Sequence, residues 1–515
     1  MQDLKAGRVL ADEIDLRKFS RDQSIYEITP LAVVFPSDLE GLQKVINFAK
    51  EEGFPLTPRG GGSGTAGGAL GEGIIVALAS DGFFGKIGAF SRSGESIFVH
   101  AGAGVFHGDF QRCLRERGLF LPADVSSAGI SQIGGNIATK ASGPHALRFG
   151  SIDRFTEHVE FFSARGELVN TADPTTIPER FRDGLQDMAN RLLKNASAWN
   201  FLKGREGMKV ASGYNLFPFI RKLPPGELLA QLLVGSNGTL GLVTAATLRV
   251  VPYDPGRETM LLFFDDLQEA GRAIVAIRDA GVAAVEIMNR KTVRILQKRT
   301  AAGEVLTHDA HVLFIEFSGP GGHDAVAEVR GILKAGGYRT LADPVIGTVE
   351  DEIEKLWEAR RQILWLIRNP APHLKALSVV NDVGVPLRHL ADFIVEVEKV
   401  FENHGLETMI YGHGGSGNLH LRPLFDVTRS DLPEAIKRLT DDVYEVVFRF
   451  GGTVSAEHGT GRLRIAYLQR EWGDALYGFM QELKALFDPQ GLLNPGVMFG
   501  EQGFSRHLRK DFSAP

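Results

Sequence analysis

Residues Pro58–Ala69 read PRGGGSGTAGGA, and this glycine-rich stretch indicates the kind of fold that the chain adopts. Eight of the 14 residues from Gly60 to Gly73 are glycine. Such a segment cannot form a comfortable helix, because each glycine costs roughly 1 kcal/mol relative to alanine there. It suits a loop whose bare backbone N–H groups wrap a diphosphate, and a flexible surface loop is the alternative.

The same stretch contains the pattern G-x-G-x-x-G, starting at Gly62. A dinucleotide-binding loop of the Rossmann type opens directly into a helix. Here the glycines continue to Gly73, and residues 74–78 (IIVAL) then predict a buried strand. We therefore reject the Rossmann interpretation.

A second glycine-rich stretch, YGHGGSGNLHLRP, begins at Tyr411 and sets His413 and His420 seven residues apart. The later stretch SAEHGTG supplies adjacent Glu457 and His458. Two imidazoles and a carboxylate suit a divalent metal, and the remaining imidazole could act as a base. A structural metal, histidines packed as polar core, and a plain polar turn are the alternatives.

Composition agrees with a cytoplasmic enzyme. The 515 residues suffice for two or three domains, and a net charge of −6 gives no reason to expect nucleic acid. No apolar run approaches the ~20 residues that span a bilayer, so no transmembrane segment is expected. The lone cysteine, Cys113, excludes a disulfide within the chain and an iron–sulfur cluster held by this chain alone.

The pattern of expected strands and helices changes near residues 252–256 (PYDPG). We interpret this segment as a domain boundary. Beyond it, strands and helices alternate, which predicts a sheet with helices over one face. The strands expected are 31–35, 74–79, 96–101, 259–264 and 312–317, and the helices are 39–52, 267–280 and 325–335.

Several separated motifs identify a family. The chain resembles the FAD-linked oxidoreductases of the vanillyl-alcohol oxidase type, and within them the D-lactate, glycolate and D-2-hydroxyglutarate dehydrogenases. The resemblance runs from about Leu31 to Phe499. Besides the first glycine-rich loop, the motifs are IGGNIATKASGPHALRFG (133–150), KVASGYNL (209–216), GSNGTLGLVT (235–244) and DPQGLLNPG (488–496).

This resemblance implies an α+β fold. Residues 1–252 would form a PCMH-type FAD-binding domain of two α+β subdomains. Residues 253–515 would form the FAD-linked oxidase C-terminal domain, with a ferredoxin-like α+β cap over the substrate, a metal site and a C-terminal helical segment.

The family pattern also implies where FAD binds, with residues 133–143 alternatively serving only as a packing element. No histidine or cysteine lies in the first loop, and His145 is the one nearby candidate for a covalent bond, so non-covalent FAD is expected. The implied FAD contacts are Arg59, Gly60, Gly61, Gly62, Ser63, Gly64, Ser127, Ile133, Gly134, Gly135, Asn136, Ser142, Gly143 and Asn494.

By the same resemblance, a divalent metal (Zn, Mn or Fe) would be held by His413, His420 and Glu457. A 2-hydroxy acid can chelate such a cation through its hydroxyl and carboxylate, which lowers the hydroxyl pKa. His458 would take the hydroxyl proton while hydride passes to flavin N5. Arg360 would grip the substrate carboxylate, although a solvated helix charge is a strong alternative for this residue.

The chain departs from the family pattern at Ser416, Asn237, Arg464 and Arg422. Arg422 stands where relatives carry Asn or an apolar residue, two positions after His420. Alternate residues of a strand share a face, so Arg422 could enter the same pocket and suit a second carboxylate. An exterior salt bridge is about equally compatible with the sequence.

We therefore expect a metal-assisted FAD-dependent D-2-hydroxyacid dehydrogenase, D-lactate dehydrogenase-like, with a D-2-hydroxyglutarate dehydrogenase or a glycolate oxidase subunit as alternatives. The resemblance fades at Phe499, without the cysteine-rich domain of long relatives. A separate electron acceptor is therefore expected: an iron–sulfur subunit, an electron-transferring flavoprotein, a cytochrome or a quinone. A non-redox flavoprotein of the alkylglycerone-phosphate synthase kind is the alternative from another class, and a homodimer is left open.

Overall fold

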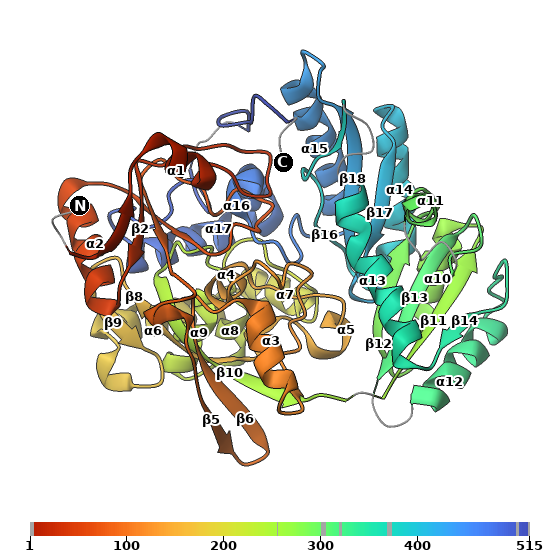
Figure 1. Cartoon of the computed structure of the whole chain (residues 1–515), viewed down its shortest axis with the longest axis horizontal. Coiled ribbons are helices and arrows are strands. Elements are labelled where there is room, and N and C mark those ends of the chain that lie inside the picture. The colour runs from red at the N-terminus through yellow and green to blue at the C-terminus, as the bar shows by residue number, and fades with distance from the viewer. Residues whose placement is uncertain are drawn as a thin grey trace.

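The molecule has two halves that lie side by side, one containing the N-terminal part and the other the middle of the chain (Figure 1). The computed structural model describes residues 5–254, 256–299, 305–318, 322–367, 373–500 and 504–512. The described strands form three sheets, two of them in the first half. The fold mixes helices and sheets, as the motifs predict.

The first sheet carries the glycine-rich loop. Its strand order is β1 (Gly7–Leu10), β2 (Ala32–Pro36), β4 (Ile74–Ala77), β3 (Leu56–Arg59), and the last three run parallel. Helix α2 (Leu39–Glu52) covers it, capped at its start by Asp38 and ended by Gly53 in the left-handed conformation. The predicted helix 39–52 is confirmed at both ends, and the loop runs from β3 into β4 rather than into a helix.

The second sheet also lies in the first half of the molecule (Figure 1). It runs β5 (Ile87–Ser93), β6 (Ser96–Gly102), β10 (Leu242–Pro252), β8 (Thr156–Phe162), β9 (Leu168–Asn170), with β7 (Leu119–Phe120) on β10. Three helices on this half lie between β6 and β8 in sequence: α3 (His107–Arg115), α4 (Ile133–Thr139) and α5 (Ala146–Phe149). Helix α4 packs against both β6 and β10.

The third sheet dominates the second half. Its order is β14 (Val345–Gly347), β11 (Arg257–Phe264), β13 (His311–Ser318), β12 (Val282–Met288), β17 (Thr408–Gly412), β18 (Asn418–Asp426), β15 (Leu374–Ala376), with β16 (Val383–Gly384) on β18. Strands β11 and β12 both pair antiparallel with β13, so they are parallel to each other across it.

Helices cover both faces of the third sheet, so the expectation of helices over one face was wrong. One face packs on α10 (Leu267–Ile277), α12 (Gly322–Ala335), α14 (Leu390–Asn403) and α15 (Leu432–Arg449). The other packs on α11 (Arg290–Arg299) and α13 (Glu350–Ile367). Every residue of β12 is buried, which is the pattern of a strand covered on both sides.

The C-terminal helices return to the first half (Figure 1). Helices α16 (Gly461–Arg464) and α17 (Leu468–Phe487) follow the second half in sequence, and α17 kinks at Gly473. The apolar face of α17 completes a core with α6 (Glu179–Lys194), α7 (Ala196–Arg205), α8 (Phe217–Arg221) and α9 (Pro225–Leu233). In the described part of the chain, no helix has the length and apolar character to cross a bilayer.

Candidate active site

One cavity connects the glycine-rich loop of the first half with residues of the second. Residues 58–66 and 125–127 line it, together with most of residues 131–142 and 236–243. Arg422, Glu457 and His458 line the same cavity. Arg422, from the second glycine-rich region of the sequence, thus lies at the same cavity as the first region, some 350 residues upstream, whereas His413 and His420 do not line it.

The loop has the bare backbone that a diphosphate requires. A Cβ on Gly61 would lie 1.6 Å from the carbonyl oxygen of Ile130, so no other residue fits without moving the backbone. Gly62 adopts a positive φ of 70°. Among the described residues, the backbone N–H groups of residues 61–64 donate to no protein acceptor.

Arg59 holds this loop in place, because its guanidinium is hydrogen-bonded to backbone carbonyl groups. Its guanidinium donates to the carbonyl oxygens of Phe19 (3.1 Å), Arg21 (2.8 Å) and Ala69 (3.3 Å). Burial lowers the pKa of Arg59 from its ordinary value, with Asp22 acting in the opposite direction. Arg59 thus fixes the position of the loop against the N-terminal segment.

Most of the predicted FAD contacts line the cavity, and three do not. Those that line it are Arg59, Gly60, Gly61, Gly62, Ser63, Gly64, Ser127, Gly134, Gly135, Asn136 and Ser142. Ile133 belongs to the apolar core, and Gly143 packs against the backbone of Asp124. Asn494 donates to the carbonyl oxygens of Gly68 and Asn237, so it ties the loop to residues 235–238 from outside the cavity.

Sequence reasoning missed several cavity residues. The GSNGTLGLVT motif was used only to recognise the family, yet Ser236, Asn237 and Gly238 form part of the wall. Asn237 holds a positive φ of 52°, a strained conformation for a residue with a side chain. The place of this segment among the family motifs was the available signal.

The four predicted metal and base residues lie together, with the three histidines arranged around one carboxylate oxygen of Glu457. Strand β17 ends just before His413, and the register of β17 with β18 places His420 opposite Tyr411. Oε1 of Glu457 lies 3.4 Å from Nε2 of His413, 3.3 Å from Nε2 of His420 and 3.4 Å from Nε2 of His458.

Nδ1 of both His413 and His420 is fixed by a protein partner, so that Nε2 of each ring lies near Glu457. Nδ1 of His413 lies 2.6 Å from Oε1 of Glu286, and Nδ1 of His420 lies 2.8 Å from the carbonyl oxygen of Asn381. A hydrogen bond at Nδ1 leaves the Nε2 lone pair free for a metal, which is the usual arrangement around metal-binding histidines. The donor set therefore fits a divalent cation.

Glu457 keeps its charge although it is buried. Its Oε2 accepts from Lys209 Nζ (2.5 Å) and from the Ser142 hydroxyl (3.2 Å). Burial alone would raise the pKa of Glu457, but the charges of Lys209 and His413 outweigh it and hold the pKa well below its usual value. Oε1 remains directed at the histidines.

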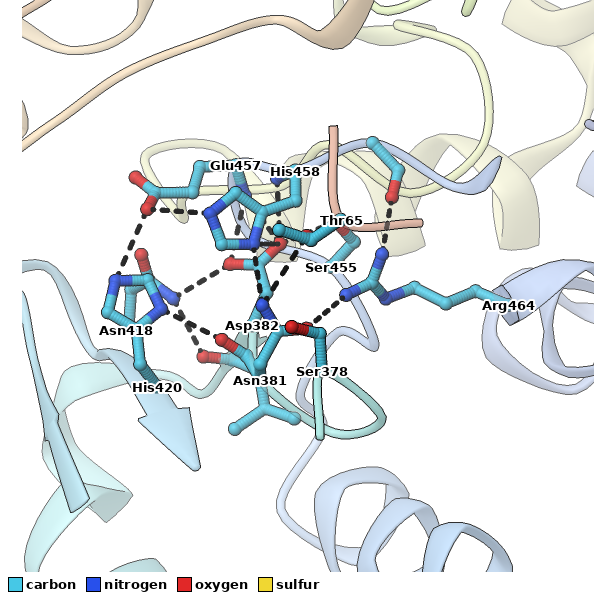
Figure 2. A network of polar contacts seen from close by, with 12 residues as sticks. Thr65, Ser378, Asn381, Asp382, Asn418, His420, Ser455, Glu457, His458 and Arg464 are labelled. Carbon is cyan, nitrogen blue, oxygen red and sulfur yellow. Dashed lines mark hydrogen bonds and ion pairs between the residues drawn. The ribbon is translucent and has the colours of Figure 1, made fainter. Parts of the chain in front are cut away.

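Asp382, which the sequence analysis did not single out, organises the loop that carries Glu457 and His458 (Figure 2). Its carboxylate accepts from the backbone N–H groups of Glu457 and His458, the Ser455 hydroxyl and the Asn418 amide. One group of possible metal ligands comprises Asp382, His420, Glu457 and His458, with ligand atoms within 4.8 Å of one another. Because its oxygens already accept these hydrogen bonds, we assign Asp382 to positioning.

His458 faces the cavity and is half-buried. Its Nδ1 lies 3.3 Å from the amide nitrogen of Asn381 and 3.6 Å from Asp382. Burial lowers the pKa of His458 to about 4, against the opposing charges of Asp382 and Glu457. A neutral imidazole at pH 7 can accept a proton.

Arg360 lies elsewhere than the cavity wall. Its Nε and Nη2 both contact Oε2 of Glu286, at 2.6 and 2.5 Å, on the side of that carboxylate away from His413. Burial would raise the pKa of Glu286, but Arg360 and then His413 hold it far below its usual value. The contacts thus form a chain from Arg360 through Glu286 to His413.

His145, the one candidate for a covalent bond to flavin, does not line the cavity. Its Nε2 lies 2.7 Å from Oε1 of Glu316 in β13, and its ring packs on Trp357. This contact joins the first half of the molecule to the second.

Two family models match the chain in succession. The model described as "FAD binding domain" matches residues 30–172, and the model described as "FAD linked oxidases, C-terminal domain" matches residues 255–498.

Curated relatives are similar over nearly the whole chain. The glycolate oxidase subunit GlcD of Bacillus subtilis (strain 168) is 27% identical, covering 93% of this chain and 91% of its own. The D-2-hydroxyglutarate dehydrogenase of Escherichia coli (strain K12) is also 27% identical, over 98% of this chain but only 51% of its own, so this chain spans about half its length. The D-lactate dehydrogenase of Archaeoglobus fulgidus is 26% identical, over 90% of both.

A solved structure of alkyldihydroxyacetonephosphate synthase is similar in fold, with a TM-score of 0.62 over 95% of this chain and 82% of its own. It is 17% identical, so the match speaks for the vanillyl-alcohol oxidase type of fold and not for an activity.

Proposed function

Because the chain belongs to the FAD-linked oxidases, we propose that it is a dehydrogenase that oxidises a 2-hydroxy acid to the 2-oxo acid. The observation that carries this proposal is the single cavity lined by the glycine-rich loop and by Glu457 and His458. A diphosphate-binding loop and a base beside a metal-ligand cluster are what a hydroxy acid oxidation by flavin needs. The relatives named for glycolate, D-2-hydroxyglutarate and D-lactate support the same substrate class.

FAD, bound non-covalently along residues 59–64 and 131–142, would supply the hydride acceptor. The free N–H groups of residues 61–64 would bind its diphosphate, while Arg59 keeps the loop in place through the carbonyl groups it contacts.

A divalent cation held by His413, His420 and Glu457 would supply a Lewis acid toward the hydroxyl and carboxylate of the substrate. Glu286 and the Asn381 carbonyl orient the two imidazoles, and Lys209 holds the second oxygen of Glu457. The closeness of Glu457 Oε1 to Nε2 of His413 (3.4 Å) and Nε2 of His420 (3.3 Å) supports this ligand set.

His458 would take the proton of the substrate hydroxyl as the C–H bond releases its hydride. The lowered pKa keeps the imidazole neutral, and Asp382 holds the backbone N–H of His458 at 2.8 Å. The side-chain amide of Asn381, 3.3 Å from Nδ1, further restricts the ring.

The electrons would leave to a separate redox partner. The Bacillus subtilis relative is named as a subunit, and this supports a partner for the present chain. The acceptors that we consider are an iron–sulfur subunit, an electron-transferring flavoprotein, a cytochrome or a quinone.

Anaerobic bleaching of the visible flavin band tests the proposal. D-lactate, L-lactate, glycolate, D-2-hydroxyglutarate and D-malate would be added in turn to purified holoprotein, before and after chelator treatment. We expect rapid bleaching by a D-acid, lost with the chelator and restored by a divalent metal. Bleaching that ignores the chelator would remove the metal from the mechanism, and a flavoprotein reduced by none of them would favour the non-redox class.

A further inference from the structure

We propose that Arg422 binds a second carboxylate, and hence that the substrate is a dicarboxylic 2-hydroxy acid. This inference rests on the proposed function and deepens it. Arg422 lies on β18, lines the cavity together with Glu457 and His458, and is only 3% exposed. A guanidinium buried to this degree normally has an anionic partner, because removing a charge from water is costly.

Within the described part of the chain, Arg422 has no such partner. Its Nη1 donates to the hydroxyl of Ser378, a neutral group, and it forms no ion pair. Its Nε is buried and donates to no acceptor. The side chain therefore presents an unsatisfied donor and an uncompensated charge at the wall of the cavity.

The other buried arginines near the site have more acceptors within the protein, although Nε of Arg464 also lacks one. Arg360 pairs with Glu286, Arg59 donates to three carbonyl oxygens, and Arg464 donates to Gly459 and to Asn381. Arg422 differs from them because its one acceptor among the described residues is the hydroxyl of Ser378.

The carboxylates of the site already have partners within the protein. Glu286 pairs with Arg360 and His413, Glu457 pairs with Lys209, and Asp382 accepts from backbone N–H groups. The anion for Arg422 must therefore come from a ligand.

The position of Arg422 fits a substrate with two acid groups. It lies two residues beyond His420 on the same face of β18, about 7 Å along the strand. The carboxyl carbons of a four- or five-carbon diacid are separated by about 4–5 Å, given C–C bonds near 1.5 Å. A diacid whose hydroxyl end lies at the histidine cluster can thus extend its distal carboxylate toward Arg422.

The first test compares two substrate classes on holoprotein. Anaerobic flavin reduction would be titrated with D-malate and D-2-hydroxyglutarate, and with the monoacids D-lactate and D-2-hydroxybutyrate. For Arg422→Gln, we expect the concentration giving half-maximal rate to rise on the order of 10- to 100-fold for the diacids, as for loss of a charge-assisted hydrogen bond, with little change for the monoacids. Arg438→Gln, on the exposed face of α15, is the matched control and should change neither class.

Equal losses for both classes, or a wild-type protein that prefers monoacids, would overturn the inference while leaving the proposed function intact. Reduction by neither class would instead refute the proposed function.

A second measurement needs no variant, in case Arg422→Gln does not fold. Binding to the wild-type protein would be compared for two compounds: the diacid that reduces the flavin fastest, and its analogue in which an amide replaces the distal carboxylate. We expect the amide to bind on the order of 10- to 100-fold more weakly, judged also by the shift of the oxidised flavin spectrum with the unreactive 2-oxo products. Equal binding of acid and amide would refute a distal anion site.

Discussion

At the scale of single residues, Glu286 is the most informative position to change. Its carboxylate fixes the ring of His413 at 2.6 Å, so Glu286→Gln would weaken the hold on this imidazole without changing the size of the side chain. We expect affinity for a divalent metal to fall about 10- to 100-fold, as for other residues that orient metal-binding histidines. Metal content after dialysis, together with a binding titration, measures this.

Glu354→Gln is the control for that change, because Glu354 pairs with Arg257 and Arg361 away from the histidines. If Glu286→Gln retained metal as tightly as this control and the unchanged protein, the support of His413 by Glu286 would be irrelevant to metal binding.

Some residues of the site could be predicted from the sequence and others could not. The spacing of His413 and His420 and the adjacent Glu457 and His458 predict a cluster that the structure indeed brings together. Glu286 could not be predicted in the same way, because it is a single charged residue far away in sequence, whereas Lys209 opens the motif KVASGYNL, to which no role was assigned. Asp382 did carry a signal: an Asn–Asp pair interrupts the apolar run ALSVVNDVGV, and buried polar residues in such a run need partners.

At the scale of the element, the turn of the glycine-rich loop depends on one close backbone approach. Gly61→Ala would place a Cβ 1.6 Å from the Ile130 carbonyl oxygen, and a backbone neighbour cannot move aside cheaply. We expect flavin content after purification to fall severely and the protein to lose about 1–3 kcal/mol, the usual cost of overpacking. Flavin absorbance per protein and chemical denaturation measure both effects.

Gly129→Ala is the matched control, since nothing lies within 4 Å of its Cβ position. It should retain flavin and stability. Full flavin content in Gly61→Ala would show that the loop can shift without losing its ligand.

Elements were predicted best where local signals agree. Helix α2 has a capping Asp38, an apolar stripe and a terminal Gly53, and its predicted limits are those observed. The faces of the third sheet were predicted wrongly, because strand–helix alternation gives the order of elements but not which face each helix covers. The fully buried β12 shows that an apolar run, rather than an alternating one, was the informative feature.

At the scale of the whole molecule, the two halves are joined by pieces distant in sequence. Helix α17 follows the second half but packs in the core of the first, and Arg422, Glu457 and His458 close a cavity built mostly by the first. Family motifs predict two domains in succession, and the two family models match residues 30–172 and 255–498. How the halves meet depends on contacts such as His145 with Glu316, which join residues 171 positions apart and have no local signature.

That contact predicts how stability depends on pH. Burial opposes the charged form of His145, but Glu316 and Asp124 outweigh it and raise its pKa to about 10, against about 6.5 in the unfolded chain. A raised pKa contributes stability that is fully present below pH 6.5 and is lost as pH rises through 10.

His145→Gln, which leaves Glu316 buried without this partner, should therefore cost about 3–5 kcal/mol at pH 6 and progressively less toward pH 10. Thermal melting of both proteins at pH 6, 8 and 10 measures the difference, with His100→Gln in β6 as a control outside this contact. A difference in melting temperature that stays constant across this range would mean that His145 acts through packing on Trp357 and not through its charge.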